Sequence, residues 1–126
     1  MDRIIKQLNL QMPWLVMMTL ITIQSAMTSS LLVQLPRGFD KVIHFFIFFV
    51  LGWLLARGLF GNPLKTSPAR WAAILVGGAL FAMLDEMHQA LVPGRYADFK
   101  DWLADMAGLT LAALWYYHVH LRVPRR

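Results

Sequence analysis

The chain has 126 residues, of which 58% are hydrophobic and only 15% are charged. A soluble domain of this length is nearer half apolar and a quarter charged, so the composition favours a membrane protein. The net charge of +5 is not gathered on a basic face that would suit nucleic acid, and the absence of cysteine excludes disulfides and thiolate chemistry.

The apolar residues fall into four blocks, each about 20 residues long, the length a helix needs to cross roughly 30 Å of hydrocarbon. The blocks are residues 13–32, 42–60, 71–91 and 102–120. Connectors of about ten residues leave too little polar sequence to cover a soluble helical core. The sequence therefore predicts an all-α fold: a single domain over residues 1–126, forming an integral membrane bundle of four transmembrane helices.

The first block is the most polar of the four, because threonine, serine and glutamine dilute it. The basic start of the chain resembles the lead of a signal peptide. Ser25-Ala26-Met27 is a poor cleavage site, however, because its small-x-small pattern is not clean. We expect the first block to stay as a span, although the sequence alone leaves cleavage open.

The basic residues are unequally divided between the two ends of these blocks. Eight of the twelve lie before the first block, around the second connector or after the fourth block: Arg3, Lys6, Arg57, Lys65, Arg70, Arg122, Arg125 and Arg126. Six of the seven acidic residues lie at the opposite ends. Basic residues in short loops stay cytoplasmic, so we expect both termini to be cytoplasmic and the first and third connectors to be outside.

The second block opens with Asp40, Lys41 and His44, and Asp40 and His44, four residues apart, share one helix face. Asp40 has a second interpretation as the cap of this helix. The third block ends with Glu86 and Gln89 before Pro93-Gly94, which should stop the helix.

The fourth block begins with Asp98, Asp101 and Asp105, whose spacings of three and four place them on one helix face. Asp98 is also a natural N-cap, since acids suit a helix N-terminus. Arg95 stands on the short connector before it, as a counter-ion for the acids or as a phosphate contact.

Small residues repeat at every fourth position in the last three blocks. They are Gly52 with Ala56, Ala73 with Gly77, Gly78 with Ala82, and Ala104 with Gly108 and Ala112. Such stripes let helix backbones approach closely in lipid, so we expect the second, third and fourth helices to touch.

Helix rise places the three polar groups at a similar depth, about one or two turns below the outer surface. Ionisable groups at that depth usually face a protein interior or a wet cavity, which predicts one acidic and histidine site open to the outside. The candidate catalytic residues are His44, Glu86, Asp101 and Asp105, and the candidate substrate-binding residues are Asp40, Lys41, Gln89 and Arg95. The alternative is an internal hydrogen-bond network that only specifies helix packing.

The ordered motifs Asp40-Lys41-x-x-His44, Glu86-x-x-Gln89, Pro93-Gly94-Arg95 and Asp101-x-x-x-Asp105-x-x-Gly108 resemble the VanZ-like family of small membrane proteins. The resemblance covers roughly residues 39–111. It implies a multi-pass protein of the bacterial cytoplasmic membrane with an extracytoplasmic active face. The family's prototype is associated with resistance to the glycopeptide antibiotic teicoplanin. Many relatives have asparagine where this chain has Asp105, which leaves the exact chemistry open.

The resemblance also implies a phosphate-linked lipid or a lipid-linked cell-wall precursor as partner. Arg95, with Lys41 or Lys100, would hold the phosphate, and His44 or Glu86 would act as general base or nucleophile. We expect no cofactor; a divalent cation on Asp101 and Asp105, with Asp40 or Glu86, is the alternative.

The sequence leaves three functions open. They are an enzyme that hydrolyses or transfers lipid phosphates, a non-catalytic protein that binds a lipid or an amphiphilic antibiotic, and, less favoured, an ion path. The ion path is disfavoured because no charged residue continues the route through the inner halves of the blocks. The oligomeric state is not decided.

Overall fold

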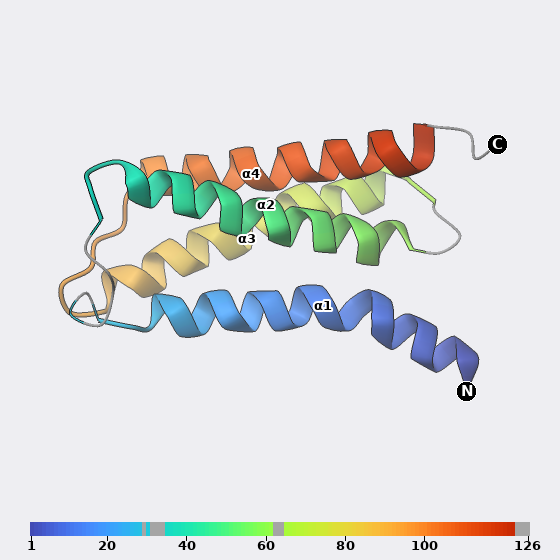
Figure 1. Ribbon diagram of the computed structural model, residues 1–126, viewed down its shortest axis with the longest axis horizontal. Helices are drawn as coiled ribbons and strands as arrows, with labels where there is room; N and C mark the ends of the chain where they lie inside the picture. The colour runs from blue at the N-terminus through green and yellow to red at the C-terminus, as the bar shows by residue number, and fades with distance from the viewer. Residues whose placement is uncertain (29, 31–34, 62–64, 123–126) are drawn as a thin grey trace.

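The computed structural model describes residues 1–28, 30, 35–61 and 65–122. Those residues form α1 (Asp2–Ser25), α2 (Phe39–Phe60), α3 (Pro68–Ala90), α4 (Phe99–Tyr117) and a closing π-helical turn, η2 (His118–Arg122). They contain no strand, which confirms the all-α class. Neighbouring helices run in opposite directions, so the start of α1 and the end of α4 lie at one end of the bundle, and the end of α1, the start of α2 and the α3–α4 connection lie at the other (Figure 1).

Two of these helices, α2 and α3, are long and apolar enough to cross a membrane, by length and composition. Only 33% of the apolar window of α2 and 22% of that of α3 is buried inside the chain. The outward face of α3 is strongly apolar, with Val76, Leu80 and Leu84 all more than half exposed. A core helix of a soluble protein would hide such a face, whereas lipid would cover it. Spans at α1 and α4 stay a prediction.

The helix ends differ from the apolar blocks in a regular way. The helices α2, α3 and α4 each begin three residues before the predicted block. The residue immediately before each helix sets its start, rather than the first apolar side chain. Gly38, with φ of +85°, precedes α2; Ser67 accepts the backbone N–H of Arg70 at α3; Asp98 accepts that of Lys100 at α4. Capping by Asp98 is therefore confirmed. Capping by Asp40 is wrong, since Asp40 lies inside α2.

The first helix departs most from its predicted block of residues 13–32. It begins eleven residues earlier, at Asp2, with Pro13 inside it, and ends at Ser25, short of the predicted boundary. Residues 29, 31 and 32 of that block lie outside the described residues. Hydropathy missed the start because the first three turns of α1 alternate polar and apolar side chains.

The helices α2 and α4 approach most closely, at two glycines. A Cβ on Gly52 would collide with the backbone carbonyl of Leu109, and a Cβ on Gly108 with that of Phe45. On α3, Gly78 gives room to the Leu109 side chain, so the second, third and fourth helices do touch. The neighbouring stripe of Ala73 and Gly77 was wrongly predicted as a contact, since both residues are exposed.

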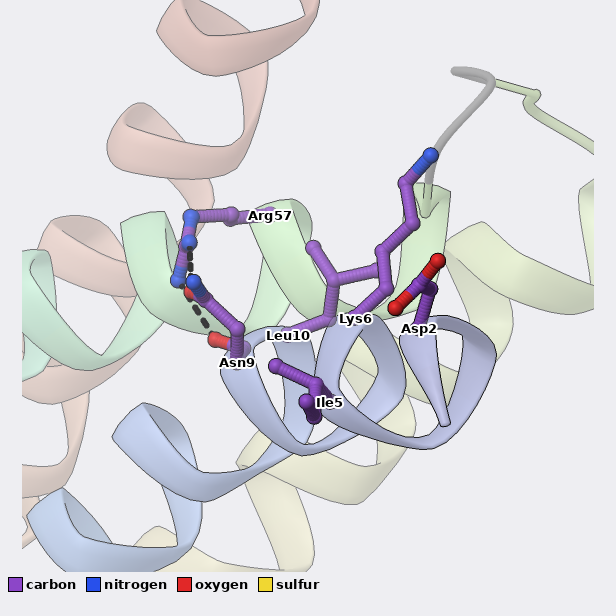
Figure 2. A pocket seen from close by; sticks show the side chains of 6 residues that line it. All are labelled: Asp2, Ile5, Lys6, Asn9, Leu10 and Arg57. Atoms are coloured by element: carbon purple, nitrogen blue, oxygen red, sulfur yellow. Dashed lines mark hydrogen bonds between the residues drawn. The ribbon is translucent and has the colours of Figure 1, made fainter.

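The first helix is attached near the end of the bundle that carries the termini. Gly58 of α2 admits the Trp14 ring, and the Gln11 amide donates to the carbonyl of Gly58 at 3.1 Å. One turn away, the Arg57 guanidinium donates to the carbonyl of Asn9 at 2.9 Å across a shallow hollow of about 390 Å³ (Figure 2). This hollow lies toward the start of α1, and the contact between Asn9 and Arg57 beside it fixes α1 to α2.

Candidate functional site

A larger hollow of about 960 Å³ lies at the opposite end of the bundle, between the α1–α2 and α3–α4 connections. All four helices contribute to its lining. The lining side chains that carry charge or chemistry include Lys41, His44, Arg95, Asp98, Lys100 and Asp101. The structure therefore opens a polar cavity where the sequence predicted a convergent site.

His44 is the centre of this polar region and joins three helices. Its Nδ1 lies 2.8 Å from Asp105 Oδ1 and 3.7 Å from Glu86 Oε1, and its Nε2 lies 3.8 Å from Asp101 Oδ2. The three carboxylates are buried, with exposed fractions of 0% for Asp105, 5% for Glu86 and 6% for Asp101. The structure thus brings all four candidate catalytic residues together.

The hydrogen bond between His44 and Asp105 determines which nitrogen of the histidine ring carries the proton. An ionised carboxylate only accepts hydrogen bonds, so in the tautomer that pairs with an ionised Asp105 the proton is on Nδ1. The other nitrogen, Nε2, then keeps its lone pair and points toward the Asp101 side. A histidine oriented in this way can take a proton from a bound molecule or coordinate a cation.

Lys41 closes the outer rim of the site and is held by three carboxylates. Its Nζ lies 2.8 Å from Asp101 Oδ1, 3.0 Å from Asp98 Oδ2 and 3.2 Å from Asp40 Oδ2. The backbone N–H of Lys100 and the Lys41 ammonium both hold the pKa of the Asp98 carboxyl below its usual range. Lys41 therefore already has three carboxylate partners, and its positive charge offsets theirs instead of being available to an added anion.

Glu86 has one oxygen fixed and one without a partner. The backbone N–H of Asp98 donates to Glu86 Oε2 at 3.0 Å, which ties the end of α3 to the start of α4. Within the described part of the chain, Glu86 Oε1 and Asp105 Oδ2 are buried and accept no hydrogen bond. Buried polar atoms are nearly always paired, so we expect these two oxygens to have a partner other than the hydrogen-bond donors of the described residues.

Gln89 lies in a separate polar cluster, which the sequence did not distinguish from the first. The Ser25 hydroxyl donates to Asp85 Oδ1 at 2.5 Å, and the Gln89 amide donates to Asp85 Oδ2 at 3.0 Å and to Ser25 Oγ at 3.3 Å. All three side chains are buried. The spacing of Asp85 and Gln89 by four residues was the signal for their pairing, whereas Ser25 was hidden in the polar first block.

Arg95 also contacts the end of α1, which the sequence did not predict. Its Nη1 donates to the carbonyls of Gln24 and Ser25, at 3.2 and 3.4 Å, and so caps the C-terminal end of α1. Among the described residues it forms no ion pair with an acid, so its interpretation as a counter-ion is wrong. The Arg95 side chain still lines the large hollow.

The Ser25 cluster makes a prediction about stability. Replacing Ser25 with alanine should lower the free energy of unfolding by about 1–3 kcal/mol, because the buried Asp85 loses a hydrogen-bond donor. Thr22→Ala is the matched control, since the Thr22 hydroxyl is exposed and donates only to the Met18 carbonyl of its own helix. Thermal unfolding in detergent measures both variants. Equal melting temperatures would show that the cluster does not hold α1 in place.

Comparison with protein-family models gives a match to the VanZ/LLP1 model over residues 2–121. Comparison with curated proteins and with solved structures gives no match. The family match spans almost the whole chain, and so extends the resemblance seen in the motifs of residues 39–111 to α1 and to the end of α4. The chain therefore belongs to the VanZ-like family.

Proposed function

We propose that this VanZ-like protein hydrolyses or transfers phosphate-linked lipid head groups, or lipid-linked cell-wall precursors, at the outer face of the bacterial cytoplasmic membrane. The family's link to glycopeptide resistance fits an activity directed at the cell envelope. The observation that carries the proposal is the oriented imidazole: His44 is 2.8 Å from Asp105 and lines a polar hollow of about 960 Å³.

His44 has the surroundings of a general base. Asp105 holds Nδ1 and stabilises the imidazolium that forms when Nε2 accepts a proton. In hydrolysis, Nε2 would take the proton of a water as its oxygen attacks phosphorus, and the lipid alcohol or phosphate would leave. Glu86 and Asp101 lie within 4 Å of the same ring and would stabilise its positive charge.

Cationic side chains line the mouth of the same hollow. Arg37, Arg95 and Lys100 all contribute to its wall. Because Lys41 is engaged by three carboxylates, these three are the better candidates for charge-assisted hydrogen bonds to a phosphate. We therefore propose that Arg37, Arg95 and Lys100 contact the phosphate. Lys41 and Asp40 lie at the rim of the same hollow.

A non-catalytic binding protein is the second candidate function. It is favoured because side chains of the site also hold the helices together. Lys41, Glu86 and Asp98 are linked by ion pairs and a backbone hydrogen bond, as in a network that fixes helix packing. The volume of the hollow is also within the range, about 300–1,000 Å³, of sites that bind small molecules. This candidate predicts that removing the basicity of His44 leaves function intact.

The direct test uses the purified full-length protein in lipid vesicles. A lipid phosphomonoester and a polyprenyl diphosphate are each supplied in the vesicles, and release of inorganic phosphate is followed over time. The proposal expects release above that of protein-free vesicles with at least one of the two. Tight binding of either lipid without any release or transfer product would select the binding protein instead.

We also propose that the chain spans the membrane four times, with both termini in the cytoplasm. Support comes from the basic residues around the termini and the α2–α3 connector, together with the position of the start of α1 and the end of α4 at one end of the bundle (Figure 1). The large hollow then faces outward, because it is formed at the opposite end.

The absence of native cysteine makes this topology testable by single-cysteine labelling. Tyr96→Cys, at a position that is 85% exposed on the α3–α4 connection, should react with a membrane-impermeant maleimide in intact spheroplasts. Lys65→Cys, exposed before α3, should react only after the membrane is permeabilised. The opposite labelling pattern would place the hollow in the cytoplasm and contradict the proposed orientation.

A further inference from the structure

His44, Glu86 and Asp101 are arranged as ligands around a common point. Each offers one ligand atom, and the three atoms lie within 4.8 Å of one another. Metal–ligand bonds of about 2.0–2.6 Å allow two ligands of one ion to be at most about 4–5 Å apart. The separation of 3.8 Å between His44 Nε2 and Asp101 Oδ2 already satisfies that limit. Small side-chain rotations would be enough to bring all three ligand atoms within bonding distance of one ion.

The unpartnered oxygen of Glu86 is independent evidence for a ligand at this point. Glu86 is only 5% exposed, and its Oε1 lies 3.7 Å from His44 Nδ1 without a hydrogen-bond partner in the described residues. The Asp98 N–H holds the other oxygen, so the carboxylate is fixed with Oε1 free. A buried carboxylate oxygen left in this state is the donor expected of a cation ligand.

Asp105 completes the arrangement without being a ligand itself. Histidines that bind metals usually donate their second N–H to a carboxylate, which fixes the tautomer and raises the basicity of the ligating nitrogen. Asp105 is fully buried and holds His44 Nδ1 in this way, which leaves Nε2 for the cation. The need for a carboxylate that accepts the Nδ1–H of His44 also explains why position 105 is an aspartate.

The charges of the site favour the same conclusion. Three buried carboxylates, Glu86, Asp101 and Asp105, surround one histidine, and among the described residues Lys41 is ion-paired with Asp101 of these three. Buried carboxylates repel each other unless a counter-charge is close. A divalent ion would supply that charge at the point where the carboxylates converge.

We propose that His44 Nε2, Glu86 and Asp101 bind one divalent cation of the zinc and manganese class. Mixed imidazole and carboxylate ligands suit these ions better than calcium, which prefers oxygen alone. Three protein ligands leave coordination positions open toward the hollow, where a phosphate oxygen or a water fits. With the ion bound, Nε2 would be a ligand and not the general base, and a water on the ion would supply the nucleophile instead. That catalytic use rests on the function proposed above, but binding of the ion does not.

The test is a Mn²⁺ titration of the full-length protein in detergent after treatment with EDTA, with free Mn²⁺ followed by electron paramagnetic resonance. We expect one Mn²⁺ per chain in the wild type and a Kd at least tenfold weaker in Glu86→Gln and Asp101→Asn. Asp85→Asn is the matched control, because Asp85 is an equally buried carboxylate one residue before Glu86 but belongs to the Ser25 cluster. Its Kd should equal that of the wild type.

A second readout keeps the test decisive if one variant folds poorly. In EDTA, Glu86→Gln and Asp101→Asn should melt at a higher temperature than the wild type, because each removes one of the converging charges. Adding Mn²⁺ should then raise the melting temperature of the wild type alone. Absence of binding, or binding that both variants retain, overturns the proposal.

The two proposals fail in different ways. Stoichiometric Mn²⁺ binding without any phosphate release would keep the cation site and remove the enzyme. Phosphate release that persists in EDTA, with no Mn²⁺ bound, would keep the enzyme and remove the cation site.

Discussion

Replacing His44 with glutamine is expected to lower phosphate release by about 10²–10⁴-fold while the protein still folds. Glutamine is similar in size and can still donate a hydrogen bond to Asp105, so the contact between α2 and α4 is largely kept. What is lost is a nitrogen that can take a proton. Initial rates of phosphate release in lipid vesicles, compared at equal amounts of folded protein, measure this effect.

His118→Gln is the matched control for that experiment. His118 is exposed in η2, at the end of the bundle away from the large hollow, so its replacement should leave the rate unchanged. A fall in both variants would point to a general effect on the protein. Full activity in a well-folded His44→Gln variant would rule out the histidine as general base.

Replacing Gly108 with alanine is expected to prevent normal folding. The added Cβ would overlap the Phe45 carbonyl, and it would also come within 3.0 Å of the Phe49 nitrogen. Both obstacles are backbone, so they cannot move aside as a flexible side chain does, and α2 and α4 must separate. Overpacking of this kind costs about 1–3 kcal/mol or more, and here it also disturbs the helices that hold His44 and Asp105. The measurements are the yield of monodisperse protein and its melting temperature.

Gly77→Ala provides a control of the same chemistry. Gly77 lies within α3, and an added Cβ there meets nothing within 4 Å. Alanine is the better helix former by about 0.5–1 kcal/mol, so this variant should fold as well as the wild type or slightly better. Equal behaviour of the two alanine variants would mean that the close approach of α2 and α4 is not required.

Much of the fold and the centre of the site could be predicted from the sequence because both follow from local periodicity. Apolar blocks fixed the position of α2 and α3, and the capping pattern of Asp98 marked the start of α4. The site required only that polar residues at the same depth meet, and His44, Glu86, Asp101 and Asp105 do.

The rest depends on how helices pack, which periodicity does not determine. Two adjacent small-residue stripes on α3 looked equivalent, but only the Gly78 stripe faces α4. Gln89 and Arg95 line the large hollow, but their contacts with α1 could not be predicted because the position of α1 was not known. In the structure the end of α1 brings Ser25 and two carbonyls to them.

The central claim is that α2 and α4 hold His44 and Asp105 as one buried, interacting pair. A double-mutant cycle of unfolding free energies with His44→Ala, Asp105→Ala and the double variant, all in EDTA, tests it most directly, because each single variant removes the contact. The account predicts that the two effects are not additive, with a coupling energy of about 1–3 kcal/mol. Effects that add within about 0.5 kcal/mol would contradict it, because residues that do not touch are expected to behave in that way.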